Sequence, residues 1–267
     1  MSKLTIKRTV HNEHHSYKVF VSDGIGWMNL LKNYESWFEN LLDTLHLSKE
    51  TVFVDIGANI GQTMLKVLSR NPSVQYIGFE PNKKCIAYLE QLVALNRYEN
   101  VSLFNFALSD EKGETLLLLR FDDDLLATTS PSFRKYTNYA RRQKVKQISG
   151  DELLERERIE HVTILKVDVE GGEANVLLGL IHTIRKCQPI IICEVLPLHS
   201  KSEEVQSFRN ESALKILNMM EDLDYQIINI KTGHEVKAIH EFSASLESSN
   251  YIFLPADQYD DLKEKLF

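Results

Sequence analysis

The fold is decided at Val52-Phe53-Val54-Asp55-Ile56-Gly57-Ala58-Asn59-Ile60-Gly61, where a β-branched and aromatic run stops at a glycine. The run predicts a buried strand, and the residues that follow, to about Arg70, predict a helix. In open α/β sheets, strand-to-helix turns of this kind lie at the carboxyl edge, where ligands bind. Glycine lets the backbone approach a ligand closely, and the first helix amides offer donors to an anionic group. We therefore expect a cofactor site at this turn.

Strands and helices alternate through the rest of the chain. Besides 52–56, short runs predict strands at 76–79, 101–107, 163–167, 190–194, 225–230 and 251–254. Helices are expected at 83–96, 173–185 and 212–222. This alternation predicts an α/β fold with a Rossmann-like, mostly parallel, seven-stranded sheet and helices on both faces. No clear long helix joins the last two strands, which allows an antiparallel hairpin at the edge.

Two segments lie outside this alternation. Residues 1–48 are expected to form an N-terminal extension, a β-hairpin plus a helix over 29–47, ahead of one domain over 49–267. The extension helix either covers the sheet or pairs with a second copy of the chain in a homo-oligomer. Residues 121–143 are expected to form an inserted loop or lid, with strands at 114–120 and 144–148 on either side.

Composition narrows the class of protein. The 267 residues suit one large α/β domain or a domain with an extension. A net charge of −7 argues against a general nucleic-acid binder, which needs a basic surface. The three cysteines show no CxxC spacing, which favours a reducing compartment. There is no apolar run of signal-peptide length at the N-terminus and none long enough to span a bilayer. These features predict a soluble, cytoplasmic protein.

The spacing after Gly57 separates two kinds of cofactor. A dinucleotide fingerprint that starts at Gly57 needs glycine at positions 59 and 62, where this chain has Asn59 and Gln62. This weakens the hypothesis of NAD. A bulkier turn suits a ligand without a pyrophosphate, such as S-adenosylmethionine with its methionine carboxylate.

The second strand ends in a carboxylate. Glu80 follows Asp55 by 25 residues (80 − 55), and an acidic side chain at that place can accept hydrogen bonds from both ribose hydroxyls. Pro81 stops the strand, and Asn82 can cap the next helix. The alternative is that Glu80 and Asn82 are only a strand end and a helix cap.

Four segments resemble the FkbM-type methyltransferases, over roughly residues 50–196. They are Asp55–Gly61, Phe79-Glu80-Pro81-Asn82, Ala107-Leu108-Ser109-Asp110 and Leu165–Glu173. One departure is Gly172, where the usual form of the last segment has alanine. The resemblance implies a class I methyltransferase fold, S-adenosylmethionine as methyl donor, and O-methylation of sugars or natural-product hydroxyls. The predicted cofactor-binding residues are Asp55, Gly57, Ala58, Asn59, Gly61, Glu80, Pro81, Asn82, Ala107 and Asp168.

Three charged residues alternate where a buried strand is expected. Period two places Lys166, Asp168 and Glu170 on one face of the strand, at the same sheet edge as the cofactor turn. We expect Asp168 to face the methionine end of the cofactor or the acceptor, with Glu170 as a base or metal ligand. A purely structural Lys-Asp pair is the alternative for Lys166.

Glu194 ends the next strand and faces the same edge. With Lys166, Asp168 and Glu170 it completes the set of candidate catalytic residues. Glu194, or His199 five residues later (199 − 194), could complete an acid–base pair. Asp168, Glu170 and Glu194 are also candidate ligands for Mg²⁺, which prefers oxygen ligands.

The insert is basic and aromatic from Phe133 to Lys146, although the whole chain carries a net charge of −7. As a lid it would suit an anionic acceptor such as a nucleotide-linked or lipid-linked sugar. The alternative is a solvated loop. Thr128, Thr129 and Ser130 lie at the root of this lid.

Three functions are therefore weighed. The leading hypothesis is a methyltransferase acting on a sugar hydroxyl of a glycan, glycolipid or glycosylated natural product. The second is an NAD-dependent oxidoreductase or epimerase, which positions 59 and 62 count against. The third is a non-catalytic cofactor-binding domain, which gains nothing from the charges at 166, 168, 170 and 194.

Overall fold

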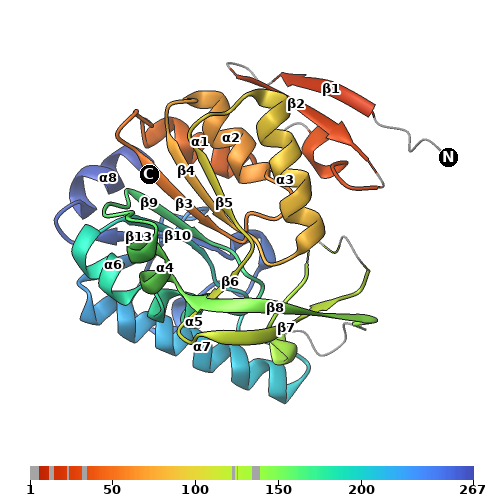
Figure 1. Ribbon diagram of the computed structural model, residues 1–267. Helices are drawn as coiled ribbons and strands as arrows, with labels where there is room; N and C mark the ends of the chain where they lie inside the picture. Colours follow the sequence, from red (N-terminus) through yellow and green to blue (C-terminus); the bar gives the residue numbers. More distant parts are fainter. Residues whose placement is uncertain are drawn as a thin grey trace.

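A computed structural model describes residues 6–11, 15–22, 24–31, 35–121, 124, 126–133 and 139–267. It shows a twisted central sheet with helices on both sides (Figure 1). None of the helices among these residues is long and apolar enough to cross a membrane.

The central sheet has the strand order β12-β11-β13-β10-β9-β3-β4-β5. Five neighbouring strands run parallel: β3 (Val52–Ile56), β4 (Gln75–Phe79), β5 (Val101–Phe104), β9 (Ile164–Val167) and β10 (Ile190–Glu194). The other three are antiparallel to their neighbours: β11 (Tyr225–Asn229), β12 (Glu235–Val236) and β13 (Asn250–Pro255). The predicted Rossmann-like sheet with an antiparallel edge is confirmed. The short β12 makes it eight-stranded rather than seven-stranded.

The strand order reverses at β3, which lies between β4 and β9. Chain connections leave to opposite sides of the sheet there, so a crevice opens above the carboxyl ends of β3 and β9. This is the position of the Gly57 turn and of the residues that follow Val167. The fold therefore brings together two segments that are far apart in the sequence.

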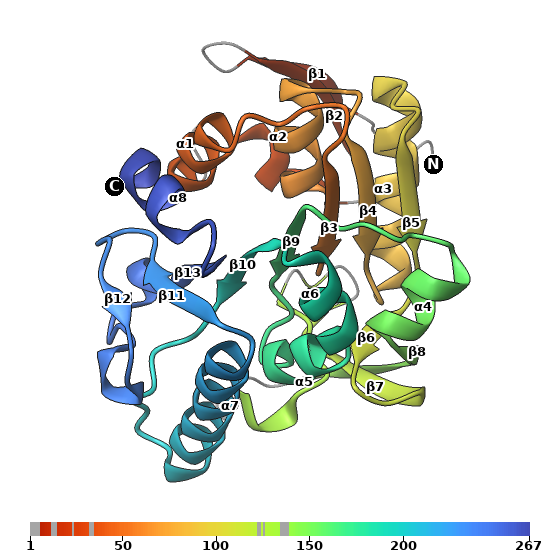
Figure 2. The same cartoon turned by 90° about the vertical axis from the view of Figure 1, so that its left-hand side faces the viewer.

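Two hydrophobic clusters cover the two faces of the sheet. Phe53 packs in the cluster with α1 (Ser36–Thr44), α2 (Gln62–Arg70) and α3 (Lys83–Asn96). Val54 packs in the cluster with α4 (Gly150–Arg156), α5 (Glu173–Leu178), α6 (Ile181–Cys187) and α7 (Glu203–Asp222). Adjacent strand residues thus face opposite layers. Figure 2 shows both helix layers and α8 (Tyr259–Leu266) beside α1.

The helix expected at 173–185 is divided into α5 and α6. A Cβ atom on Gly179 would lie 1.9 Å from the carbonyl oxygen of Ser109, so only glycine allows this close approach. The carbonyl of Gly179 also accepts bonds from Ser149 Oγ (2.9 Å) and Asp151 N (2.8 Å). The chain breaks the helix here because the backbone packs directly against another segment.

The strand expected at 101–107 is also divided. β5 stays in the central sheet, and β6 (Ala107–Ser109) joins a second sheet of order β6-β8-β7. The predicted strands on either side of the insert form β7 (Gly113–Leu119) and β8 (Arg141–Ser149). Figure 1 shows this small sheet beyond the carboxyl ends of β3, β4 and β5. The insert therefore starts and ends beside the crevice.

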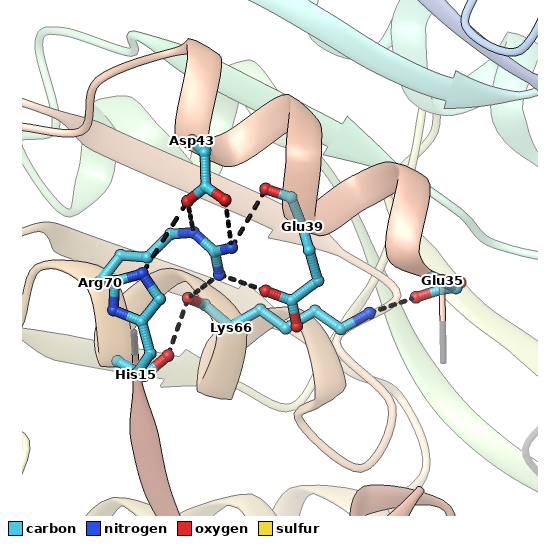
Figure 3. A network of polar contacts seen from close by, with 7 residues as sticks. His15, Glu35, Glu39, Asp43, Lys66 and Arg70 are labelled. Atoms are coloured by element: carbon cyan, nitrogen blue, oxygen red, sulfur yellow. Dashed lines mark hydrogen bonds and ion pairs between the residues drawn. The ribbon is translucent and has the colours of Figure 1, made fainter. Parts of the chain in front are cut away.

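The N-terminal hairpin is confirmed as β1 (Ile6–His11) and β2 (Ser16–Val21). The helix expected at 29–47 is shorter: a 3₁₀ turn over Met28–Leu30 and α1 over Ser36–Thr44 replace it. Ion pairs between α1 and α2 fix this segment (Figure 3), with Arg70 bound to Glu39 and Asp43. The hairpin is held to α3, where Tyr88 Oη donates to the Phe20 carbonyl at 2.6 Å. The extension shares its core with α2 and α3.

Candidate functional site

The Gly57 turn packs directly on the end of β9. Gly57 has φ of +91°, and a Cβ there would lie 1.9 Å from the carbonyl oxygen of Asp168. The amides of Gly57 and Ala58 both donate to the Phe79 carbonyl at 3.0 Å. The turn therefore ties the ends of β3, β4 and β9 together, which explains why glycine is needed at position 57.

Glu80 lies at the end of β4, with its carboxylate held by two backbone amides. Oε2 accepts from Asn59 N at 2.9 Å, and Oε1 accepts from Asn82 N at 2.7 Å. Burial raises the pKa of Glu80 to about 7, against the lowering effect of these two donors. Each oxygen of a carboxylate has a further lone pair, so both can still accept a hydroxyl.

The neighbours of Glu80 fix its backbone. Asn82 caps α3 as predicted, since its side chain accepts from Lys84 N at 3.0 Å. Asn105 Nδ2 donates to the carbonyls of Glu80 (2.8 Å) and Pro81 (3.0 Å). Asn105 was not predicted as a site residue, because no local pattern indicates that residue 105 reaches the end of β4.

A first pocket opens between the Gly57 turn and Glu80. This "Glu80 pocket" has about 620 Å³ of open space, mouth included. Most of its lining is apolar, and β7 and the insert supply part of it. The lining residues include Gly57, Asn59, Phe79, Glu80, Pro81, Phe106, Ala107, Leu117, Thr129, Asp168, Glu170 and Gly172.

A second, more polar pocket adjoins the first. This "Glu35 pocket" has about 1050 Å³ of open space, mouth included. It shares Gly57, Asn59, Asp168 and Glu170 with the Glu80 pocket. Its other lining residues are Met28, Glu35, Ala58, Gln62, Thr63, Arg120, Phe121, Leu126 and Lys166. A ligand that extends from one pocket into the other must pass Asp168 and Glu170.

Lys166 holds Asp168 at this junction. Lys166 Nζ lies 2.9 Å from Asp168 Oδ2, and Lys166 is only 7% exposed. Burial opposes its charge, but the carboxylates of Asp168 and Asp55 outweigh burial and raise its pKa. The carboxylate of Asp168, by contrast, is about one-third exposed and reaches both pockets.

Asp55 lies beneath the turn and lines neither pocket. It is fully buried opposite Lys166 in the β3–β9 register and accepts a hydrogen bond from Tyr76 Oη. Burial raises its pKa to about 6, although Lys166 lowers it. Gly61 and Asn82, two other predicted cofactor residues, also lie outside the lining of both pockets. These three residues support the site without lining either pocket.

Glu170 sits on a tight turn rather than on the strand. Its φ is +57°, and its carbonyl accepts from Thr128 Oγ at 2.6 Å. On the other side, the Glu173 carboxylate accepts from the amides of Val169 (3.2 Å) and Gly171 (3.0 Å). The insert and α5 therefore hold this turn between them, and the sequence did not indicate either contact.

Glu194 lies apart from the two pockets. It accepts from Ser249 Oγ at 2.9 Å and faces a separate small cavity with Glu173 and Arg209. Burial, and then the charge of Asp168, raise its pKa to about 7. Among the residues that the structure describes, no group of three or more His, Cys, Asp or Glu could hold a metal ion. Asp168, Glu170 and Glu194 therefore do not form the predicted Mg²⁺ site. His199 is exposed.

The prediction of a basic lid over 133–146 is wrong for the described part. Arg141 and Arg142 lie on β8, are exposed, and line neither pocket. The ring of Phe133 packs within 2.5 Å of where a Cβ on Gly171 would lie. Arg134, Lys135 and Tyr136 lie outside the described residues. Arg120, bound to Asp124, is the arginine that lines the Glu35 pocket.

Comparison with known proteins identifies the family. Residues 55–227 match the model of the methyltransferase FkbM domain. The chain belongs to the FkbM methyltransferase family. The match begins at the Gly57 turn and includes Glu80, Asp168 and Glu170. Membership favours the methyltransferase hypothesis over the oxidoreductase and the non-catalytic domain.

Two curated relatives show the range of proteins that carry this domain. The chain is 27% identical over 217 residues to the AMB antimetabolite synthetase AmbE of Pseudomonas aeruginosa, covering 66% of this chain and 10% of AmbE. It is 29% identical over 152 residues to the hexuronic acid methyltransferase AglP of Haloferax volcanii, covering 54% of this chain and 56% of AglP. The chain thus spans only part of both relatives.

A solved structure supports the fold. A Staphylococcus aureus protein provisionally assigned as a caffeoyl-CoA O-methyltransferase superposes with a TM-score of 0.51 at 11% identity. The superposition covers 85% of this chain and 87% of that chain. The sheet described above is that of a class I, Rossmann-like methyltransferase.

Proposed function

We propose that this FkbM methyltransferase transfers the methyl group of S-adenosylmethionine to a hydroxyl of a sugar. The observation that carries the proposal is the pair of adjoining pockets. One contains the buried carboxylate of Glu80 beside the Gly57 turn, and both open onto Asp168 and Glu170. The sugar acceptor is supported by the similarity to AglP, which acts on a hexuronic acid.

The cofactor is assigned to the Glu80 pocket. Glu80 would accept the two ribose hydroxyls, and the apolar wall near Phe79, Pro81 and Ala107 would hold the adenine. The Gly57 turn and Asn59, which line both pockets, would hold the amino-acid end. Asp168 and Glu170, which also line both pockets, would then be next to the reacting end.

The acceptor is assigned to the Glu35 pocket. When bound, S-adenosylmethionine would supply an electrophilic methyl group to the acceptor hydroxyl, with a C–O bond formed as the C–S bond to the leaving thioether breaks. Glu170 would accept the proton of the acceptor hydroxyl. Asp168, held by Lys166, orients the reacting ends. Arg120 gives the pocket a cation that suits an anionic sugar.

Calorimetry with S-adenosylhomocysteine tests the cofactor assignment. The wild-type chain is expected to bind it, and Glu80→Gln is expected to weaken binding about tenfold or more, since it removes charged hydrogen bonds to the ribose. Glu114→Gln is the matched control, because Glu114 is exposed on β7 and pairs only with Lys144 at the surface. Absence of binding to the wild-type chain would contradict the proposal.

A further inference from the structure

We propose that the N-terminal segment forms a wall of the acceptor pocket, and that Glu35 binds a hydroxyl of the acceptor sugar. The inference rests on the proposed function. It assigns a specificity role to residues that precede the matched family domain, which begins at residue 55.

Glu35 stands at the pocket wall. It lines the Glu35 pocket together with Met28 from the same segment, and it does not line the Glu80 pocket. Its side chain is 28% exposed, so it remains accessible to a ligand while packed on one side. The segment therefore contributes to the acceptor side of the site and not to the nucleoside side.

An ion pair with Lys66 holds the carboxylate of Glu35 in position (Figure 3). Its Oε2 lies 3.1 Å from Lys66 Nζ, an amine that is 6% exposed and cannot reach a ligand. Burial lowers the pKa of Lys66, and the charge of Glu35 opposes this shift. Glu35 also precedes α1 at φ +53°, and Arg70 fixes α1 through Glu39 and Asp43. A carboxylate accepts about four hydrogen bonds, so Glu35 retains capacity for hydroxyl donors.

Other residues that line this pocket have the chemistry that a sugar ring needs. Phe121 and Leu126 line the same pocket, and Phe121 is 48% exposed. The guanidinium carbon of Arg120 lies 5.2 Å from the Phe121 ring centre. An aromatic surface can pack on the apolar face of a sugar while a carboxylate binds its hydroxyl edge. This combination favours a hexose ring over a flat, fully apolar acceptor.

The test uses p-nitrophenyl glycosides of glucose, galactose, mannose and glucuronic acid, with release of S-adenosylhomocysteine as the readout. For a glycoside that is methylated, Glu35→Gln is expected to raise its KM about tenfold, because one charged hydrogen bond is lost. The affinity for S-adenosylhomocysteine is expected to stay unchanged. Glu39→Gln is the matched control: it cuts the same ion-pair network at Arg70, but Glu39 lines neither pocket.

A double variant guards against a folding defect. Glu35→Gln leaves Lys66 buried without its carboxylate, which can destabilise the chain. Glu35→Gln with Lys66→Met removes both charges, and it is expected to show the same tenfold rise in KM with normal S-adenosylhomocysteine binding.

The outcomes separate the inference from the function on which it rests. An unchanged acceptor KM in both Glu35 variants would overturn the role of Glu35 and leave the methyltransferase proposal intact. An equal rise in KM for Glu39→Gln would show that Glu35 acts only through the network. If the wild-type chain binds S-adenosylhomocysteine but methylates none of the four glycosides, a hexose acceptor is wrong.

Discussion

The two pockets differ in one segment: the N-terminal extension lines the Glu35 pocket and not the Glu80 pocket, whereas the insert lines part of both. The Glu80 pocket lies over the carboxyl ends of β3 and β4, and its polar groups follow directly from strand ends. The Glu35 pocket receives Met28 and Glu35 from the extension and Phe121 and Leu126 from the insert. A sheet edge can hold a cofactor with few additions, whereas recognition of an acceptor needs walls that the sheet does not supply. The predictions below test this division.

The largest effect is expected at the junction of the pockets. Glu170→Gln removes the proposed base but keeps the size of the side chain, so the turn held by Thr128 and Glu173 should remain. We expect kcat to fall about 10²–10⁴-fold. The affinity for S-adenosylhomocysteine, measured by calorimetry, is expected to change by less than about threefold. A kcat within a factor of about five of wild type would show that Glu170 is not the base.

The second-largest effect is expected at the Gly57 turn. Gly57→Ala places a Cβ 1.9 Å from the Asp168 carbonyl at a φ of +91°. We expect this variant to lose about 3 kcal/mol of unfolding free energy, or to fail to fold, because strain and steric overlap add together. Urea denaturation followed by circular dichroism measures the loss.

Gly172→Ala is the control for this comparison. A Cβ there would lie 3.3 Å from a Val169 methyl and 4.0 Å from Thr129 Oγ, and the φ of Gly172 is −100°. We expect its stability to stay within about 1 kcal/mol of wild type. Equal destabilisation by the two variants would show that the close approach at Gly57 is not what requires glycine.

The smallest effect is a pH dependence of cofactor binding. Burial raises the pKa of Glu80 to about 7, and its ionised form is the one proposed to accept both ribose hydroxyls. Between pH 6 and pH 8 the affinity for S-adenosylhomocysteine should rise about tenfold as Glu80 ionises. Calorimetry on Glu80→Gln should show no such rise. Glu194→Gln should keep it, because Glu194 lies outside both pockets.

The unfolding free energy of the free chain is expected to fall as the pH rises, opposite to the change in cofactor affinity. A carboxyl pKa that is higher in the folded than in the unfolded state means that the folded state binds the proton more tightly. This contribution to stability is therefore present below the ordinary carboxyl pKa. It is lost as the pH rises through about 7. Cofactor affinity and the stability of the free chain should thus change with opposite signs over this interval.

The parts of the site that were predictable from the sequence are those with a local pattern. The turn at Gly57, the carboxylate at Glu80 and the cap at Asn82 each follow from a few neighbouring residues. The ion pair of Lys166 with Asp168 was the alternative interpretation of these charges, and Asp168 lies just after the end of β9 at Val167. All of these lie within the strand-to-helix units that determine the sheet.

The contacts that were not predicted join segments that are distant in the sequence. Thr128 reaches Glu170 across 42 residues, and Asn105 reaches Glu80 across 25. The break at Gly179 arises because Ser109 packs against it. The strand predicted at 144–148 is confirmed within β8, which begins three residues earlier, at Arg141. The basic residues 141–146 therefore belong to this strand and not to a lid.

The most direct test of the central claim is a crystal structure of the chain with S-adenosylhomocysteine. We expect the ribose hydroxyls within hydrogen-bond distance of the Glu80 carboxylate and the sulfur beside Asp168 and Glu170. The Glu35 pocket should remain open for the acceptor. A nucleoside bound away from Glu80, or a sulfur that points away from the junction of the two pockets, would contradict the account.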